Sequence, residues 1–133
     1  MFYCLRYMRH LLLVLLFTLF LLPGGMAAAG ESAPSEGTIV PMEFEKGAGL
    51  FKLNCASCHG LEGVGTDKGP PLVHKIYEPG HHGDMSFYLA VMKGVRAHHW
   101  RFGDMPKVEG LREKEVGSII LYVRFLQRLA GIE

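Results

Sequence analysis

Residues 54–60 read NCASCHG, and this short stretch decides how the rest of the sequence is interpreted. Cys55 and Cys58 are separated by two residues, and His59 follows at once. Two thiols and an imidazole at this spacing can form a redox-active disulfide, contribute to a metal site or attach a covalent cofactor. The remainder of the chain helps to discriminate among these uses.

Three segments show the helical spacing of apolar residues, and we find no strand-like alternation. Residues 43–54 carry the first pattern and run directly into Cys55. Residues 84–93 carry the second, with Asp84 suited to cap its start, and residues 113–130 form the broadest apolar stripe. The sequence therefore predicts an all-α domain of three to four helices.

A long stretch between the first two predicted helices, residues 60–83, is rich in glycine and proline and shows no periodicity. Loops of this length are uncommon in compact domains. Three short helices also bury little apolar surface by themselves. We infer that a large, flat, apolar cofactor fills the centre of the domain and that this loop wraps against it.

The sequence CASCH matches the C-x-x-C-H signature of haem c attachment. Cys55 and Cys58 could each form a thioether with one vinyl group of the porphyrin, and His59 would then lie beneath the ring as an iron ligand. A redox-active disulfide would be expected in a βαβ context, and a zinc site would need a second closely spaced ligand pair. A structural disulfide between the two cysteines remains the alternative in an exported protein.

Met105 is the candidate for the second axial ligand of the iron. It lies in the non-helical stretch FGDMPKV, where Pro106 favours an extended backbone for the preceding residue. Met42 precedes the first predicted helix, whereas Met85 and Met92 belong to an apolar helical stripe, where methionine usually fills the core.

With these residues identified, the chain resembles a class I cytochrome c of the small bacterial type with one haem, from about residue 43 to residue 132. In that family a glycine and an aromatic residue precede the first haem cysteine by eight and four positions. Gly47 and Phe51 match them. The resemblance implies that both pack against an aromatic residue of the last helix, for which Tyr122 is the candidate.

Two further family segments match, and both concern the iron. The G-P-x-L segment corresponds to GPPL at 69–72, and the resemblance implies that the carbonyl of Pro70 accepts the Nδ1 proton of His59. The G-x-M-P segment corresponds to GDMP at 103–106 and contains Met105. The resemblance therefore implies one covalent haem c, with His59 and Met105 as the iron ligands.

Two adjacent histidine pairs depart from the family pattern, in HHG at 81–83 and AHHWRFG at 97–103. They could form a second metal site or supply an alternative iron ligand, but the simplest interpretation is that these histidines, near the haem edge, are solvated or face the haem propionates. These residues are His81, His82, His98 and His99. Trp100 could donate a hydrogen bond to a haem propionate, with a buried packing role as the alternative.

Residues 1–29 have the anatomy of a secretory signal peptide. Arg6 and Arg9 precede an apolar run over 11–22, which is shorter than the roughly 20 residues needed to span a bilayer. Small residues at 27–29 offer a peptidase site, so we expect cleavage after Ala29 and a periplasmic protein. The alternative is an uncleaved anchor, in which case the protein would be membrane-associated.

The predicted organisation is a linker over residues 30–42, followed by a monohaem domain over 43–133. The charges of the chain are nearly balanced, with 14 basic and 13 acidic residues. Nucleic-acid binding depends on clustered positive charge, and we therefore expect no nucleic-acid partner.

The expected function is the transfer of single electrons between transient redox partner proteins, not enzymatic catalysis. Histidine and methionine ligation would raise the potential of the iron. Two alternatives remain open. The chain could be the haem subunit of a larger oxidoreductase complex, or an open-site haem enzyme or gas sensor if Met105 is not a ligand.

Overall fold

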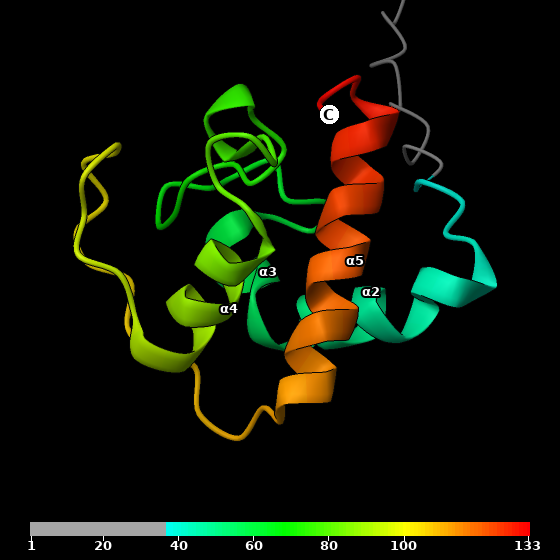
Figure 1. Cartoon of the computed structure of the whole chain (residues 1–133), viewed down its shortest axis with the longest axis horizontal. Coiled ribbons are helices and arrows are strands. Elements are labelled where there is room, and N and C mark those ends of the chain that lie inside the picture. The colour runs from blue at the N-terminus through cyan, green and yellow to red at the C-terminus, as the bar shows by residue number, and fades with distance from the viewer. Residues whose placement is uncertain (1–36) are drawn as a thin grey trace, which may run out of the picture. The chain divides into compact units, whose positions relative to one another are not determined.

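The computed structural model describes residues 37–133, which Figure 1 shows as ribbons. The predicted signal, its cleavage after Ala29 and most of the linker lie outside the described residues. Residues Thr38–Glu133 form one compact unit. Its elements, in chain order, are α2 Met42–Asn54, α3 Ala56–His59, the 3-10 helix η1 Lys75–Tyr77, α4 Asp84–Lys93 and α5 Glu113–Leu129.

The prediction of an all-α fold is confirmed. Within residues 37–133 the β pairing is limited to an isolated bridge between Val95 and Met105. The three predicted helices agree with α2, α4 and α5 to within one residue at each end. None of the helices in this part of the chain combines the length and the apolar character needed to cross a membrane.

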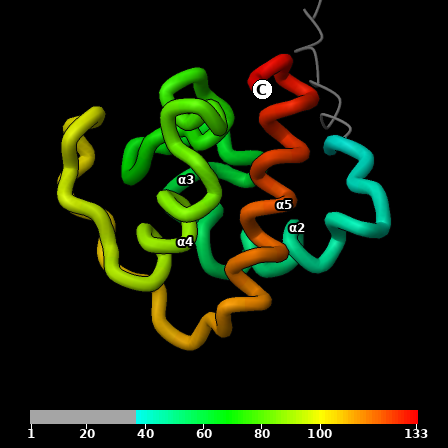
Figure 2. The backbone as a smooth tube through the Cα atoms, viewed as in Figure 1, coloured from blue at the N-terminus to red at the C-terminus, as the bar shows by residue number. Residues whose placement is uncertain are grey.

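The most extensive contact between helices is where α2 crosses α5, which Figure 2 shows as two tubes passing over each other. A Cβ atom at Gly47 would lie 2.8 Å from the carbonyl carbon of Ser118 and 2.9 Å from the Cβ of Tyr122. Real Cβ atoms almost never approach so closely, and only glycine allows this crossing. One helical turn further on, the ring of Phe51 lies 5.6 Å from that of Tyr122, which confirms the predicted packing.

The apolar core is built mainly from one face of α5. Val116 and Val123 are almost fully buried, and Phe125 stacks on Phe44 of α2 at 4.6 Å between ring centroids. Phe51 of α2 is completely buried in the same core. The amphipathic pattern recognised in the sequence therefore places α5 at the centre of the domain.

A buried arginine on α5 holds the segment that precedes α4. Arg124 donates from Nε to Asp84 Oδ1 at 2.8 Å, from Nη1 to the carbonyl of Tyr77 at 2.7 Å, and from Nη2 to the carbonyl of His82. The structure therefore corrects the prediction that Asp84 caps α4, because Gly83 is the N-cap and the carboxylate of Asp84 serves Arg124 instead. The reason is that a buried guanidinium needs a carboxylate partner.

Gln127 completes this polar anchor. Its side chain is fully buried, accepts a hydrogen bond from Arg124 at 2.6 Å, and donates to the carbonyls of Leu72 and Tyr77 at 2.8 and 3.1 Å. Together, Arg124 and Gln127 satisfy backbone carbonyls of a segment that has little regular structure. Two polar residues of α5 thereby fix the position of residues 72–83.

Candidate functional site

A cavity of about 350 Å³ lies between α5, α4 and the turn that contains the cysteines. Its volume lies within the roughly 300–1,000 Å³ typical of pockets for cofactors and small ligands. The walls are mostly aliphatic and aromatic side chains, including Phe51, Leu72, Phe87, Val91, Ile119, Ile120 and Val123. Five predicted site residues also line it, namely Cys55, His59, Pro70, Trp100 and Met105, whereas Cys58 is not among the lining residues.

The cysteine motif forms a single helical turn directly after α2. The amides of Cys58 and His59 both donate to the carbonyl of Cys55, at 3.1 and 2.9 Å, and Gly60 ends the turn with a φ of 79°. Cys55 is half-buried and Cys58 is exposed. Both thiols are free, so the structure does not contain the alternative disulfide. Burial, and to a lesser extent Cys58, raises the pKa of Cys55 to about 11, which keeps this thiol neutral.

His59 is buried, and its orientation is set by the loop that follows. Its Nδ1 lies 2.8 Å from the carbonyl oxygen of Pro70, the acceptor that the resemblance implied. When Nδ1 donates this hydrogen bond, the lone pair is left on Nε2. Burial lowers the pKa of His59, and the hydrogen bond to Pro70 offsets part of this shift. The imidazole is therefore neutral at neutral pH, the form that can ligate a metal.

Tight backbone contacts bring Pro70 against the cysteine turn. A Cβ at Gly69 would lie 2.9 Å from the carbonyl oxygen of Cys58, and a Cβ at Gly65 would lie 2.8 Å from the nitrogen of Pro71. Thr66 also donates through its hydroxyl to the carbonyl of Cys58 at 2.6 Å. The glycine-rich composition that looked structureless in the sequence thus allows the loop to fold closely over α3.

Met105 lies on a separate wall of the same cavity. Its amide and carbonyl exchange hydrogen bonds with Val95, both at 2.9 Å. A Cβ at Gly94, which has a φ of 79°, would lie 2.6 Å from the carbonyl oxygen of Met105. The predicted non-helical, extended segment is thus held against the end of α4, and Met105 occupies a defined position.

Trp100 carries a buried polar atom without a partner. Its indole Nε1 makes no hydrogen bond with any described residue, and Trp100 lines the cavity. Burial raises the pKa of the nearby Tyr77 hydroxyl, and the indole N–H of Trp100 offsets part of this rise. The geometry between this N–H and the Tyr77 oxygen is nevertheless not that of a hydrogen bond. An unsatisfied buried donor costs about 1–3 kcal/mol, so Trp100 indicates that the cavity receives an acceptor.

The structure brings the two histidine pairs together, an arrangement that the second metal site considered above would require. His82, His98 and His99 line the cavity, and His81 lies beside His99. His82 is half-buried, whereas the other three are exposed. No sequence signal could have revealed this proximity, because the pairs lie on different segments of the chain.

Comparisons with known proteins agree with this site. Residues 44–127 match the family model for cytochrome c. The chain is 29% identical over 91 residues to a cytochrome bc1 complex cytochrome c subunit from Corynebacterium efficiens. This alignment covers 67% of the chain but only 28% of the relative, so the chain spans little more than a quarter of that protein. No solved structure gives a significant match.

Members of this family hold covalent haem c, and the cavity fits such a group. It combines apolar walls with a half-buried thiol, an imidazole that retains a lone pair and a buried donor that lacks an acceptor. The predicted cofactor, haem c with its iron, and the predicted place in electron transport are therefore confirmed at the level of the family. The chain belongs to the cytochrome c family.

Proposed function

We propose that this protein is an exported carrier of single electrons whose haem iron is ligated by His59 and Met105. The observation that carries the proposal is that both side chains, one from α3 and one from the segment after α4, line the same cavity. When bound, the haem supplies one-electron chemistry by cycling between the ferrous and ferric states. The protein contributes attachment, ligation and exclusion of competing ligands.

Attachment would use the thiols of Cys55 and Cys58. The helical turn of α3 fixes both cysteines to the backbone that carries His59. Tethering and axial ligation would therefore come from one rigid unit. The hydrogen bond from His59 to Pro70 would hold the imidazole plane and increase its basicity as a ligand.

Ligation by Met105 would distinguish a carrier from an enzyme or a gas sensor. The two hydrogen bonds to Val95 restrain its backbone, which favours a fixed ligand over a displaceable one. A thioether stabilises the ferrous state and raises the potential. Ligation by both His59 and Met105 would leave no open position on the iron for oxygen or peroxide, so these residues would support electron transfer rather than catalysis.

A second candidate function is that of a haem subunit within a larger oxidoreductase complex. The observation that favours it is the similarity to a cytochrome c subunit of a cytochrome bc1 complex. A free carrier would dock its redox partners weakly and briefly, as electron-transfer encounters do. A subunit would instead co-purify with its partners from gently solubilised cells, whereas a carrier would be recovered alone.

Carbon monoxide binding tests the ligand assignment. The reduced wild-type protein should show a six-coordinate optical spectrum that carbon monoxide leaves unchanged. Met105→Ala should open the iron and bind carbon monoxide rapidly. Met85→Ala is a matched control, because Met85 is 65% exposed and does not line the cavity, and it should behave as wild type.

Rapid carbon monoxide binding by the wild-type protein would contradict the carrier and favour the open-site alternative. An unchanged spectrum in Met105→Ala would show that another residue is the ligand. The mass of the purified protein tests cleavage of the signal, because removal of residues 1–29 should leave a chain that begins at Gly30.

A further inference from the structure

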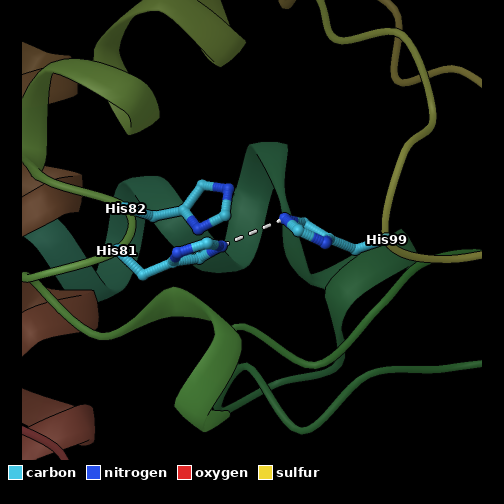
Figure 3. A group of neighbouring side chains, drawn as sticks. All are labelled: His81, His82 and His99. Carbon is cyan, nitrogen blue, oxygen red and sulfur yellow. Dashed lines mark hydrogen bonds between the residues drawn. The ribbon is translucent and has the colours of Figure 1, made fainter.

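We propose that His81, His82 and His99 form a second metal site, which binds Cu²⁺ at the edge of the haem cavity. His81 and His82 lie just before α4, and His99 lies on the segment between α4 and α5. Figure 3 shows the three rings facing one another across the space between these segments. One nitrogen from each ring lies within 4.8 Å of the others.

The spacing of two of these nitrogens suits a shared metal ion. Nε2 of His81 and Nε2 of His99 are 3.4 Å apart. Two imidazole nitrogens that bind one ion at about 2.0–2.1 Å are separated by about 2.9 Å at the right angles of tetragonal Cu²⁺ and by about 3.4 Å at tetrahedral angles. In the metal-free protein this pair can share a proton in a hydrogen bond, so Cu²⁺ would replace that proton while the two nitrogens move closer by about 0.5 Å or less.

The third ligand is oriented by contacts outside the site. Nδ1 of His82 donates to the carbonyl oxygen of Ile76 at 2.7 Å, so Nε2 keeps its lone pair. The carbonyl of His82 in turn accepts a hydrogen bond from the buried Arg124 of α5. Metal-binding histidines commonly show such an outer partner, which fixes the ring and its tautomer.

The ligand set favours copper. The three groups are imidazoles, without a carboxylate or thiolate among them, which argues against Mg²⁺ and Ca²⁺. Imidazole suits zinc, nickel and copper, and the affinity of nitrogen sites for divalent first-row metals is highest for Cu²⁺. Exposure of His81 and His99 gives the ion an entry path from solvent.

One competing use of these residues lies within the same cavity. His82 and His99 line the cavity together with His59 and Met105, so either could in principle ligate the haem iron. The contacts favour the separate site, because His82 is tied to Ile76 and His99 is paired with His81. The proposal does not depend on Met105, and a failure of the axial-ligand assignment would leave it intact.

The experiment is a titration of the purified, oxidised haem protein with copper sulfate. Calorimetry measures the affinity and stoichiometry, and electron paramagnetic resonance identifies the ligand atoms. We expect one Cu²⁺ per chain, with hyperfine splitting from several nitrogen nuclei. The double variant H81Q/H99Q should bind Cu²⁺ at least about tenfold more weakly. Loss of a residue that only supports a ligand can already weaken metal binding by about that factor, and this variant loses two ligands. His98→Gln is the matched control, because His98 is also exposed and adjacent but lies outside the trio, and it should retain the wild-type affinity.

Three results would overturn the proposal. One is the absence of stoichiometric binding to the wild-type protein, and another is undiminished binding to H81Q/H99Q. The third is a change in the haem spectrum of copper-free H81Q/H99Q, which would identify these histidines as iron ligands. The nitrogen splitting is measured on the wild-type protein, so the proposal stays testable if the double variant folds poorly.

Discussion

Replacement of Gly47 by alanine should weaken the crossing of α2 and α5 on which the fold depends. The added Cβ would meet the Ser118 carbonyl group and, at 2.9 Å, the Cβ of Tyr122. These atoms belong to the backbone of α5 and to the base of a side chain, so they cannot rotate away. The helices would have to separate, and the packing of Phe51 on Tyr122 would loosen with them.

The magnitude follows from two opposing effects. Alanine is preferred over glycine within a helix by about 1 kcal/mol, which stabilises α2. Overpacking of a close contact costs about 1–3 kcal/mol, and a rigid backbone neighbour places this site at the upper end. We therefore expect Gly47→Ala to lower the free energy of unfolding by about 1–2 kcal/mol.

Gly49 provides a matched control in the same helix, because a Cβ at Gly49 would meet no atom within 4 Å. Gly49→Ala gains the same helix preference without the collision, so it should raise stability by up to about 1 kcal/mol. Thermal unfolding of the haem-loaded variants should therefore differ by ~10 °C or more in Tm. Equal melting temperatures for the two variants would refute the argument that Gly47 is required by close packing.

Three further predictions concern polar groups. Gln127→Leu should lower the free energy of unfolding by about 1–3 kcal/mol, because the carbonyl of Leu72 and an N–H of Arg124 lose their hydrogen-bond partner. Denaturant titrations measure this change, and an unchanged midpoint of unfolding would contradict the prediction. The side-chain hydrogen bond from Arg112 is the main cause that lowers the pKa of Glu115 to about 2. The ionised Glu115 carboxylate therefore stabilises the fold above about pH 4.5, and this contribution is lost as the pH falls towards 2. The difference in unfolding free energy between wild type and Glu115→Gln should shrink over that range. A difference that does not change with pH would refute this prediction. Trp100→Phe should destabilise the haem-loaded protein by about 1.5–3 kcal/mol if a propionate accepts the indole proton, and an unaltered Tm would exclude that contact.

The helices and the apolar core could be predicted from sequence because their signals are local. The spacing of apolar residues located α2, α4 and α5, and the fixed distance of Gly47 and Phe51 from Cys55 indicated the helix crossing. The distance from His59 to the carbonyl of Pro70 was likewise foreseeable, because the matching family segment lies within the following loop.

The polar anchor and the histidine cluster could not be predicted, since they depend on tertiary contacts. Asp84 was expected to cap α4. Burial of Arg124 gives Asp84 another role, because a guanidinium removed from water needs acceptors around it. The meeting of His81 with His99 depends in turn on that anchor, which positions the chain at His82.

Gln127 and Arg124 lie in the final turns of α5, yet the carbonyls that they bind lie about 50 residues earlier. A chain that is synthesised from its N-terminus therefore cannot fix residues 72–83 until α5 has been made. Leu72, Tyr77 and His82 of that segment line the cavity. The cavity is thus completed last, well after the turn that carries Cys55, Cys58 and His59 has been made.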